Sequence, residues 1–121
     1  MGSTMGTIVV IDDDAAMRTL ICEWLAAEGY RVRGLAAADG GDADLAIVDL
    51  LNLRARGPQA LRAVRASYPR SALIGMSTQL ARSLEGDSPL ARSLGVSRLV
   101  AKPLARDELL AAVAATIDVP D

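Results

Sequence analysis

The chain has 121 residues, 51% of them hydrophobic, and its 13 basic and 15 acidic side chains give a formal net charge of −2. This length predicts a single domain with a core of its own. The charge shows no basic stripe, no apolar run is long enough to cross a bilayer, and no cationic start followed by an apolar stretch suggests a signal peptide. We therefore expect a cytoplasmic protein without a nucleic-acid or membrane partner.

Three residue types limit the chemistry that the chain can perform. It has no histidine, so the commonest general base and zinc ligand is missing. Its one cysteine, Cys22, falls inside an apolar helical pattern, which favours a buried thiol over a nucleophile or half of a disulfide. Lys102 is the only lysine among 13 basic residues, which indicates that a compact ammonium group is required at that position.

The first third of the chain predicts two strands around one helix. Residues 1–6, with two methionines and small polar side chains, are predicted to be a disordered tail or a remnant of cloning. Residues 7–11 are an apolar, β-branched run typical of a buried strand, and 30–35 form a weaker, edge-like strand. Residues 36–43 predict a loop with at most one helical turn. Between the strands, apolar residues recur at helical spacing, at Met17, Leu20, Ile21, Trp24 and Leu25.

The rest of the chain continues this alternation. Buried strands are predicted over 45–48 and 72–76, with a helix between them from Gly57-Pro58 to Tyr68-Pro69. A polar stretch, 79–89, follows the second of these strands. The remaining segments are a short helix over 90–94, a strand over 97–101, a helix from Asp107 to Ile117 and a tail over 119–121.

Strands that alternate with helices predict an α/β fold, with an open, doubly wound parallel sheet in one domain over residues 7–118. In such a sheet the carboxyl ends of the strands lie along one edge, where ligands bind. Four predicted strands end there in polar side chains. These are the acids Asp12, Asp13 and Asp14, then Asp49, Ser77 and Lys102.

This polar set predicts a phosphoryl-transfer site. A helix N-cap explains one of the three consecutive acids but not all three, because adjacent carboxylates repel each other unless a cation shares them. Mg²⁺ is the cation that carboxylate oxygens suit best. An aspartate that attacks phosphorus, acids that hold Mg²⁺, an ammonium and a hydroxyl make a complete set for phosphoryl transfer to a carboxylate. Taken singly, Asp49 could cap a helix, Ser77 could end a strand and Lys102 could belong to a turn.

Residues 7–117 resemble the receiver domains of bacterial two-component response regulators, of the chemotaxis-receiver type. The resemblance depends on Val-Ile-Asp-Asp at 10–13, on Ile-Val-Asp ending at Asp49 with Gly57 eight residues later, on Ser77, and on Lys102-Pro103. The family fold has five parallel strands in the order 2-1-3-4-5, with helices on both faces.

The resemblance implies a role for each site residue. Asp49 would accept a phosphoryl group from the phosphohistidine of a histidine kinase or histidine phosphotransferase, and Ser77 and Lys102 would contact that group. Asp12, Asp13, Asp49 and the backbone carbonyl of Leu51 would bind Mg²⁺. The domain would be a signalling receiver rather than an enzyme, catalysing only its own phosphotransfer and dephosphorylation. It would be a monomer or weak dimer that binds a downstream protein through its fourth helix, fifth strand and fifth helix.

The sequence departs from the family pattern at several places. Leu53 replaces a usual proline, and Arg54 and Arg56 are unusual in that loop. The stretch between Gly29 and Asp49 is short, so the second helix is predicted to be truncated or absent. The segment from Ser77 to Lys102 is longer than usual, and Leu99 replaces the aromatic residue that switches rotamer in many members.

Other functions remain open from the sequence. A degenerate receiver would bind a partner without being phosphorylated, which the altered loops favour. A haloacid-dehalogenase-like phosphatase would use Asp12 and Asp14, but Ala15-Ala16 replaces its usual Gly-Thr and no late acidic pair follows Lys102. A flavodoxin-like protein fits worst, because three carboxylates after the first strand would repel the cofactor phosphate.

Overall fold

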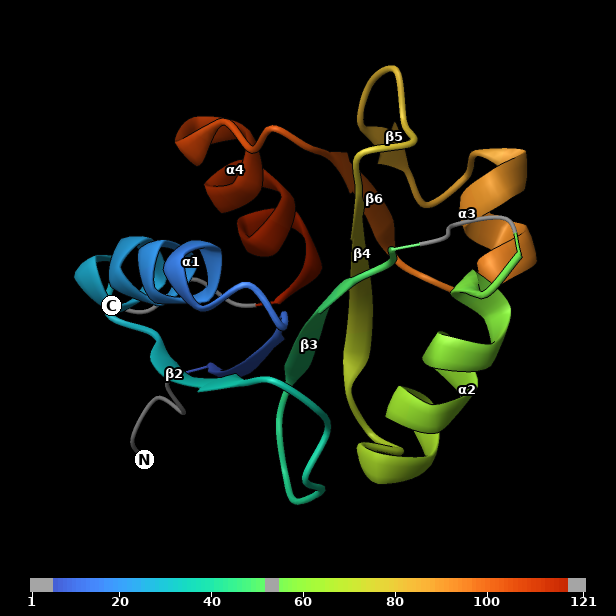
Figure 1. Cartoon of the computed structure of the whole chain (residues 1–121). Helices are drawn as coiled ribbons and strands as arrows, with labels where there is room; N and C mark the ends of the chain where they lie inside the picture. Colours follow the sequence, from blue (N-terminus) through green and yellow to red (C-terminus); the bar gives the residue numbers. More distant parts are fainter. Residues whose placement is uncertain (1–5, 52–54, 118–121) are drawn as a thin grey trace.

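The strands lie in the order β2-β1-β3-β4-β6-β5 across one six-stranded sheet (Figure 1). The computed structural model describes residues 6–51 and 55–117. The strands are β1 (Thr7–Ile11), β2 (Arg31–Leu35), β3 (Leu45–Asp49), β4 (Ala72–Ser77), β5 (Leu84–Glu85) and β6 (Arg98–Ala101). The helices are α1 (Ala15–Ala27), α2 (Gly57–Ser67), α3 (Pro89–Leu94) and α4 (Arg106–Thr116).

The predicted α/β fold is confirmed, and the strand count is corrected. The five longer strands are parallel and have the predicted order, as β2-β1-β3-β4-β6. The sixth strand, β5, lies in the segment that we predicted to be a polar loop, and it pairs antiparallel with β6 through Leu84 opposite Leu99 and Glu85 opposite Arg98. Two residues are too few to show a strand period, so only the tertiary pairing reveals this strand.

Helices cover both faces of the sheet, as predicted. In Figure 1, α1 and α4 lie on one side of the strands and α2 and α3 on the other. Each layer has its own core. The α1/α4 core contains Ile21 and Leu25 of α1 and Leu109 and Val113 of α4. The α2/α3 core contains Leu61, Val64, Tyr68, Ala91 and Leu94.

Asp14 is the N-cap of helix α1, and its Oδ1 accepts hydrogen bonds from the backbone N–H groups of Ala16 and Met17 at 3.1 and 3.2 Å. The prediction of its buried face is correct for Ile21 and Leu25, which are 0% exposed, and wrong for Leu20, which is 39% exposed. The apolar spacing includes Leu20, but the sheet covers a narrower stripe of the helix than the spacing suggests.

Residues 36–44, between β2 and β3, contain no helix, which confirms that the second helix of the family is absent. Tyr68, at the end of α2, holds this loop instead. Its hydroxyl donates to Asp39 Oδ1 at 2.6 Å and accepts from the N–H groups of Asp39 and Gly40 at 3.1 and 3.2 Å. Ala38 and Ala43 pack against the α2/α3 core, so the loop takes over part of the missing helix's covering role.

The limits of the domain remain a prediction. Gly6 is buried, and its carbonyl accepts a hydrogen bond from the N–H of Arg31 at 3.0 Å. The rest of the predicted tails, and Leu53 and Arg54 of the unusual loop, lie outside the described residues. Within residues 6–51 and 55–117, no helix has the length and apolar character to cross a membrane.

Candidate functional site

Three of the predicted site residues converge at one edge of the sheet. Asp12 and Asp13 follow β1, and Asp49 ends the neighbouring strand β3, which pairs with β1 up to Ile11 opposite Val48. One carboxylate oxygen from each aspartate lies within 4.8 Å of the others. Three hard, anionic oxygens at this separation fit a divalent cation such as Mg²⁺.

Asp12 is the most firmly held of these acids, and its side chain is fully buried. Oδ1 accepts from the N–H of Asp14 at 2.9 Å, and Oδ2 lies 3.1 Å from Lys102 Nζ. The backbone N–H of Asp12 donates to the Leu35 carbonyl at 3.0 Å, and its carbonyl accepts from Arg18 Nη1 at 2.7 Å. All four polar positions of the residue are therefore in hydrogen bonds.

Lys102, directly after β6, forms ion pairs with an aspartate at the end of each of the strands β1 and β3. Its Nζ lies 2.9 Å from Asp49 Oδ1 and 3.1 Å from Asp12 Oδ2, and its side chain is 12% exposed. Burial lowers the pKa of Lys102, but the hydrogen bonds and charges of Asp49 and Asp12 outweigh burial, so the pKa is raised. The only lysine of the chain is thus kept in its charged form beside two carboxylates.

Asp49 lies in a less favourable environment for its charge. Burial raises its pKa, Lys102 opposes the rise, and the charges of Asp12 and Asp13 add to it. Three carboxylates and one ammonium group share this partly buried site, so the site carries excess negative charge. Such a site favours a further cation, which agrees with the oxygen geometry.

Asp13 and Asp14 separate into different roles. Asp14 caps α1, so the capping explanation applies to one of the three consecutive acids. Asp13 is exposed, and within the described part of the chain no hydrogen bond or ion pair is recorded for its carboxylate. Because Oδ1 of Asp14 caps the helix, the structure disfavours the phosphatase alternative, which requires Asp14 as its second acid.

Ser77 is at the same edge, but its hydroxyl is engaged elsewhere. The residue is 0% exposed, and its Oγ accepts from the N–H of Gln79 at 3.0 Å. Its carbonyl accepts from the N–H of Lys102 at 2.9 Å, which places Ser77 beside the lysine. Breaking the hydrogen bond between this hydroxyl and its own turn, so that it can take another partner, costs about 1 kcal/mol.

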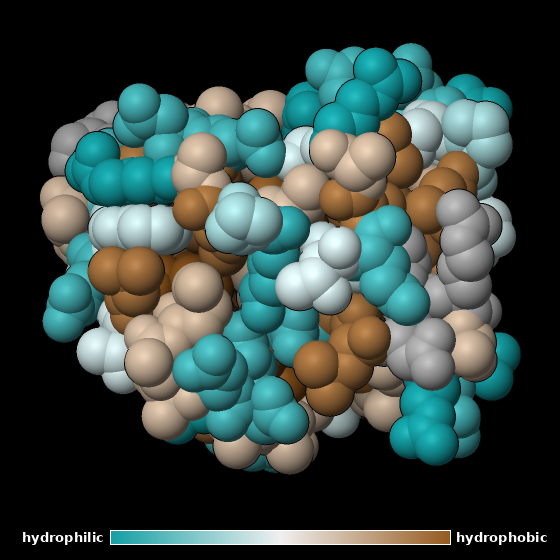
Figure 2. Space-filling model, turned by 45° about the horizontal axis from the view of Figure 1, so that its top comes forward, coloured by the Kyte–Doolittle hydropathy of each residue, from teal (hydrophilic) through white to brown (hydrophobic). Residues whose placement is uncertain are grey.

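Leu51 marks an open side of the site. It is 71% exposed, and with Asp49 it borders a pocket of about 320 Å³ whose other lining residues are Leu50, Arg56, Gly57 and Ala60. Figure 2, with the top of Figure 1 brought forward, shows hydrophilic residues that separate the hydrophobic areas of that face.

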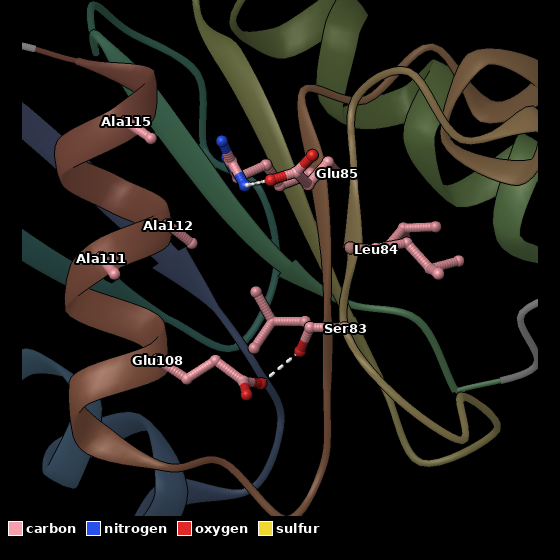
Figure 3. A pocket seen from close by; sticks show the side chains of 10 residues that line it. Ser83, Leu84, Glu85, Glu108, Ala111, Ala112 and Ala115 are labelled. Atoms are coloured by element: carbon pink, nitrogen blue, oxygen red, sulfur yellow. Dashed lines mark hydrogen bonds and ion pairs between the residues drawn. The ribbon is translucent and has the colours of Figure 1, made fainter.

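A second pocket lies on the far side of β6, between β5, β6 and α4 (Figure 3). Its volume is about 290 Å³, and the α4 wall carries Ala111, Ala112 and Ala115. Figure 3 shows Ser83 and Glu108 pointing toward each other across it. The Ser83 hydroxyl donates to Glu108, and a Glu85–Arg98 ion pair at 3.7 Å lies farther along.

Similarity to known proteins covers almost the whole chain. No protein-family model matches it. Regulatory protein VirG of Agrobacterium fabrum (strain C58) is 31% identical over 121 residues, which is 93% of this chain and 46% of the relative. Transcriptional regulatory protein CpxR of Escherichia coli (strain K12) is 29% identical, over 93% of this chain and 50% of the relative. The chain spans about half the length of the curated relatives it matches.

Solved structures show the same fold. A CheY-like response regulator receiver domain protein from Methanospirillum hungatei has a TM-score of 0.73 at 22% identity, over 93% of each chain. The BeF3-activated DrrB receiver domain has a TM-score of 0.72 at 20% identity, over 93% of this chain and 97% of the other. Chemotaxis response regulator CheY4 of Vibrio cholerae has a TM-score of 0.72 at 22% identity, over 94% and 100%.

The chain is a response-regulator receiver domain. The order of its five parallel strands is the one predicted for that family, whereas the outer side of β6 differs from the prediction. There the receiver domain has the added strand β5. Leu99, in place of the aromatic, is 0% exposed and lies opposite Leu84 of that strand.

Sequence reasoning missed several residues that support the site of this receiver domain. Arg18 bonds the Asp12 carbonyl, and Ser83 bonds both Glu108 and the N–H of Ala101, the latter at 2.9 Å. Gly75 leaves space for Leu50, since a Cβ there would lie 2.6 Å from Leu50 Cδ1. An arginine six residues after Asp12, in the first turn of the predicted helix, and a glycine inside a buried strand were the available signals.

Proposed function

We propose that this receiver domain takes a phosphoryl group from a partner phosphohistidine onto Asp49, with Mg²⁺, and thereby switches a protein-interaction surface. The observation that supports this most is the position of Lys102 Nζ, 2.9 Å from Asp49 and 3.1 Å from Asp12, within the three-carboxylate cluster. A histidine kinase or a histidine phosphotransferase would be the donor.

The chain's own groups divide the work of the transfer. A carboxylate oxygen of Asp49 forms a bond to phosphorus as the bond from phosphorus to the donor's imidazole nitrogen breaks, and the imidazole keeps that electron pair. Lys102 would move its contact from the carboxylate to a phosphoryl oxygen as the negative charge moves there, and the Ser77 hydroxyl would donate a hydrogen bond to another phosphoryl oxygen. Asp12, Asp13, Asp49 and the Leu51 carbonyl would hold Mg²⁺, which would neutralise the phosphoryl oxygens during transfer.

The output surface would comprise α3, β6 and α4, which are the counterparts of the family's fourth helix, fifth strand and fifth helix. The route from Asp49 to this surface would run through residues 79–89. That segment begins at the turn that holds the Ser77 hydroxyl and continues into β5, which is tied to β6 and α4 by Ser83. A downstream protein would bind differently when this segment has moved.

Phosphorylation by acetyl phosphate and Mg²⁺, followed by intact mass, tests the proposal. The parent protein should gain one phosphoryl group, and Asp49→Asn should gain none. A parent that stays unmodified, although it is folded and binds Mg²⁺, would contradict phosphoryl acceptance by Asp49.

The second candidate is a receiver domain that binds its partner without phosphorylation. The observation that favours it is β5, because this strand covers the outer edge of β6 and lies opposite Leu99 where an aromatic switch is expected. In that case partner affinity would be the same for the parent with beryllofluoride and for Asp49→Asn.

A further inference from the structure

We infer that Arg18 is a positioning residue of the acidic cluster: it fixes the peptide after Asp12 so that Asp13 lies where it can share a cation with Asp49. This inference deepens the proposed function and depends on it for the identity of the site. Arg18 would not touch the cation or the phosphoryl group. It would act through the main chain of Asp12.

The contact itself is short and charged. Arg18 Nη1 donates to the Asp12 carbonyl at 2.7 Å, from the first turn of α1 back to the end of β1. A hydrogen bond from an ionised guanidinium is about twice as strong as one between neutral groups. The carbonyl belongs to the peptide that joins Asp12 to Asp13, so this bond fixes the plane from which the Asp13 side chain starts.

Asp13 depends on that peptide more than its neighbours do. Asp12 is held by its own side chain, through Asp14 and Lys102, and Asp49 is held by Lys102. Asp13 is exposed, and its carboxylate has no recorded hydrogen bond or ion pair among residues 6–51 and 55–117. Its place within 4.8 Å of the other acids therefore comes from the backbone, which Arg18 holds.

Gly34 of β2 provides the space that the Arg18 side chain needs to reach the Asp12 carbonyl. A Cβ on Gly34 would lie 2.9 Å from Arg18 Cγ and 3.2 Å from Arg18 Cδ, so the stem of the arginine lies against the bare backbone of this strand. Gly34 is not among the glycines with positive φ, which are Gly29, Gly40, Gly41 and Gly95. Space for Arg18, and for Cys22 Sγ at 3.0 Å, is thus the reason that the strand needs a glycine here.

Electrostatics alone would give Arg18 the opposite effect. A guanidinium beside a cation site repels the cation, so its removal should strengthen Mg²⁺ binding if charge were all that mattered. Positioning predicts that removal weakens binding, because the acids lose their arrangement. The two explanations therefore predict opposite changes in Mg²⁺ affinity when Arg18 is removed.

The test is Mg²⁺ affinity by calorimetry in Arg18→Met, which keeps the apolar stem and loses the charge and the donor. We expect the dissociation constant to rise about tenfold, within the range typical of groups that orient metal ligands. Gly34→Ala keeps the charge but displaces the stem, and should change affinity in the same direction. Arg62→Met, an exposed arginine of α2, is the matched control and should leave affinity unchanged.

A kinetic measurement separates positioning from a general loss of structure. With acetyl phosphate as donor, Arg18→Met should need about tenfold more Mg²⁺ for half-maximal phosphorylation, yet reach nearly the parent rate at saturating Mg²⁺. Arg18→Lys, which keeps a charged donor, should restore part of the affinity.

Unchanged or tighter Mg²⁺ binding in Arg18→Met and Gly34→Ala would overturn the inference, whatever happens to phosphorylation. A parent that binds Mg²⁺ but is never phosphorylated would instead contradict the proposed function. Circular dichroism confirms that each variant is folded. If Arg18→Met does not fold, Gly34→Ala and Arg18→Lys decide the matter by the same measurement.

Discussion

Ser77 and Ser83 bond to β6 from opposite sides. Ser77 pairs with Ala101 through the β4–β6 ladder, and Ser83 Oγ accepts the outward N–H of the same Ala101 at 2.9 Å. The five residues between the two serines, 78–82, cross the carboxyl end of β6, beside Lys102. A change of partner at Ser77 therefore pulls on a short connection whose far end is tied to α4 through Glu108.

This connection gives the first prediction. Hydrogen exchange should show faster exchange in residues 79–89 and at the N–H of Ala101 when beryllofluoride and Mg²⁺ are bound, because a moved Ser77 loosens β5. Changes limited to the acidic edge, with 79–89 unaffected, would contradict this route and favour the phosphorylation-independent receiver.

Ser83→Ala is the matched variant for that experiment. It removes the bonds to Glu108 and Ala101, so β5 should exchange quickly even without beryllofluoride. Because coupling between two sites is reciprocal, the variant should also bind beryllofluoride more tightly, by about 5-fold or more. Equal affinity in parent and variant would show that the two serines are not coupled.

The second prediction concerns the acidic cluster. Mg²⁺ should bind weakly to the parent without a phosphoryl group, and Asp13→Ala or Asp49→Asn should weaken it by more than tenfold, since even changes around metal ligands cost about 10–100-fold. Calorimetry measures the effect. Asp14→Asn, which keeps the helix cap, is the control. Unchanged affinity in both ligand variants would show that these acids do not form the metal site.

The third prediction concerns Lys102. Lys102→Arg keeps the charge and should fold, but a planar guanidinium cannot replace a point ammonium 2.9 Å from Asp49 and 3.1 Å from Asp12 in a partly buried site. We expect little activation by beryllofluoride, read from the same exchange pattern. An arginine variant that switches like the parent would refute the requirement for an ammonium.

The fourth prediction is a dependence of stability on pH. The hydrogen bond from Tyr68, with the contribution of Arg33, lowers the pKa of Asp39. A carboxylate whose folded pKa lies below the unfolded value of about 3.9 stabilises the fold above that value and loses this effect as the pH falls through the folded pKa.

Thermal unfolding across this range provides the measurement. Asp39→Asn should lower the melting temperature at neutral pH, and the difference from the parent should shrink below about pH 4. Asp42→Asn, in the same loop, is the control. A difference that stays constant down to low pH would assign the effect to the lost hydrogen bonds and not to charge.

The sequence predicted the parallel strands and the acidic edge for a clear physical reason. Buried parallel strands appear as apolar runs, and topology alone then brings Asp12, Asp49 and Lys102 together. The prediction failed where a structure depends on distant contacts. β5 has only two residues, and Leu20 fits the helical period yet is exposed in the folded domain.

Supporting contacts were beyond prediction for another reason. Arg18 bonds a backbone carbonyl, and Tyr68 bonds two backbone N–H groups, which every residue possesses and no sequence pattern distinguishes. Which backbone group a side chain bonds depends on the path of the folded chain, and not on residue type. The same holds for Ser83 and the N–H of Ala101.

The tie between Tyr68 and the loop that replaces the second helix has a kinetic consequence. The loop at Asp39 and Gly40 depends on a side chain 28 or 29 positions later, beyond β3 and α2. Because β3 and α2 must be in place before Tyr68 can reach the loop, we expect these hydrogen bonds to form after the folding barrier. Loss of the tie would then speed unfolding with little effect on the folding rate, and the domain's lifetime would depend on this one hydroxyl.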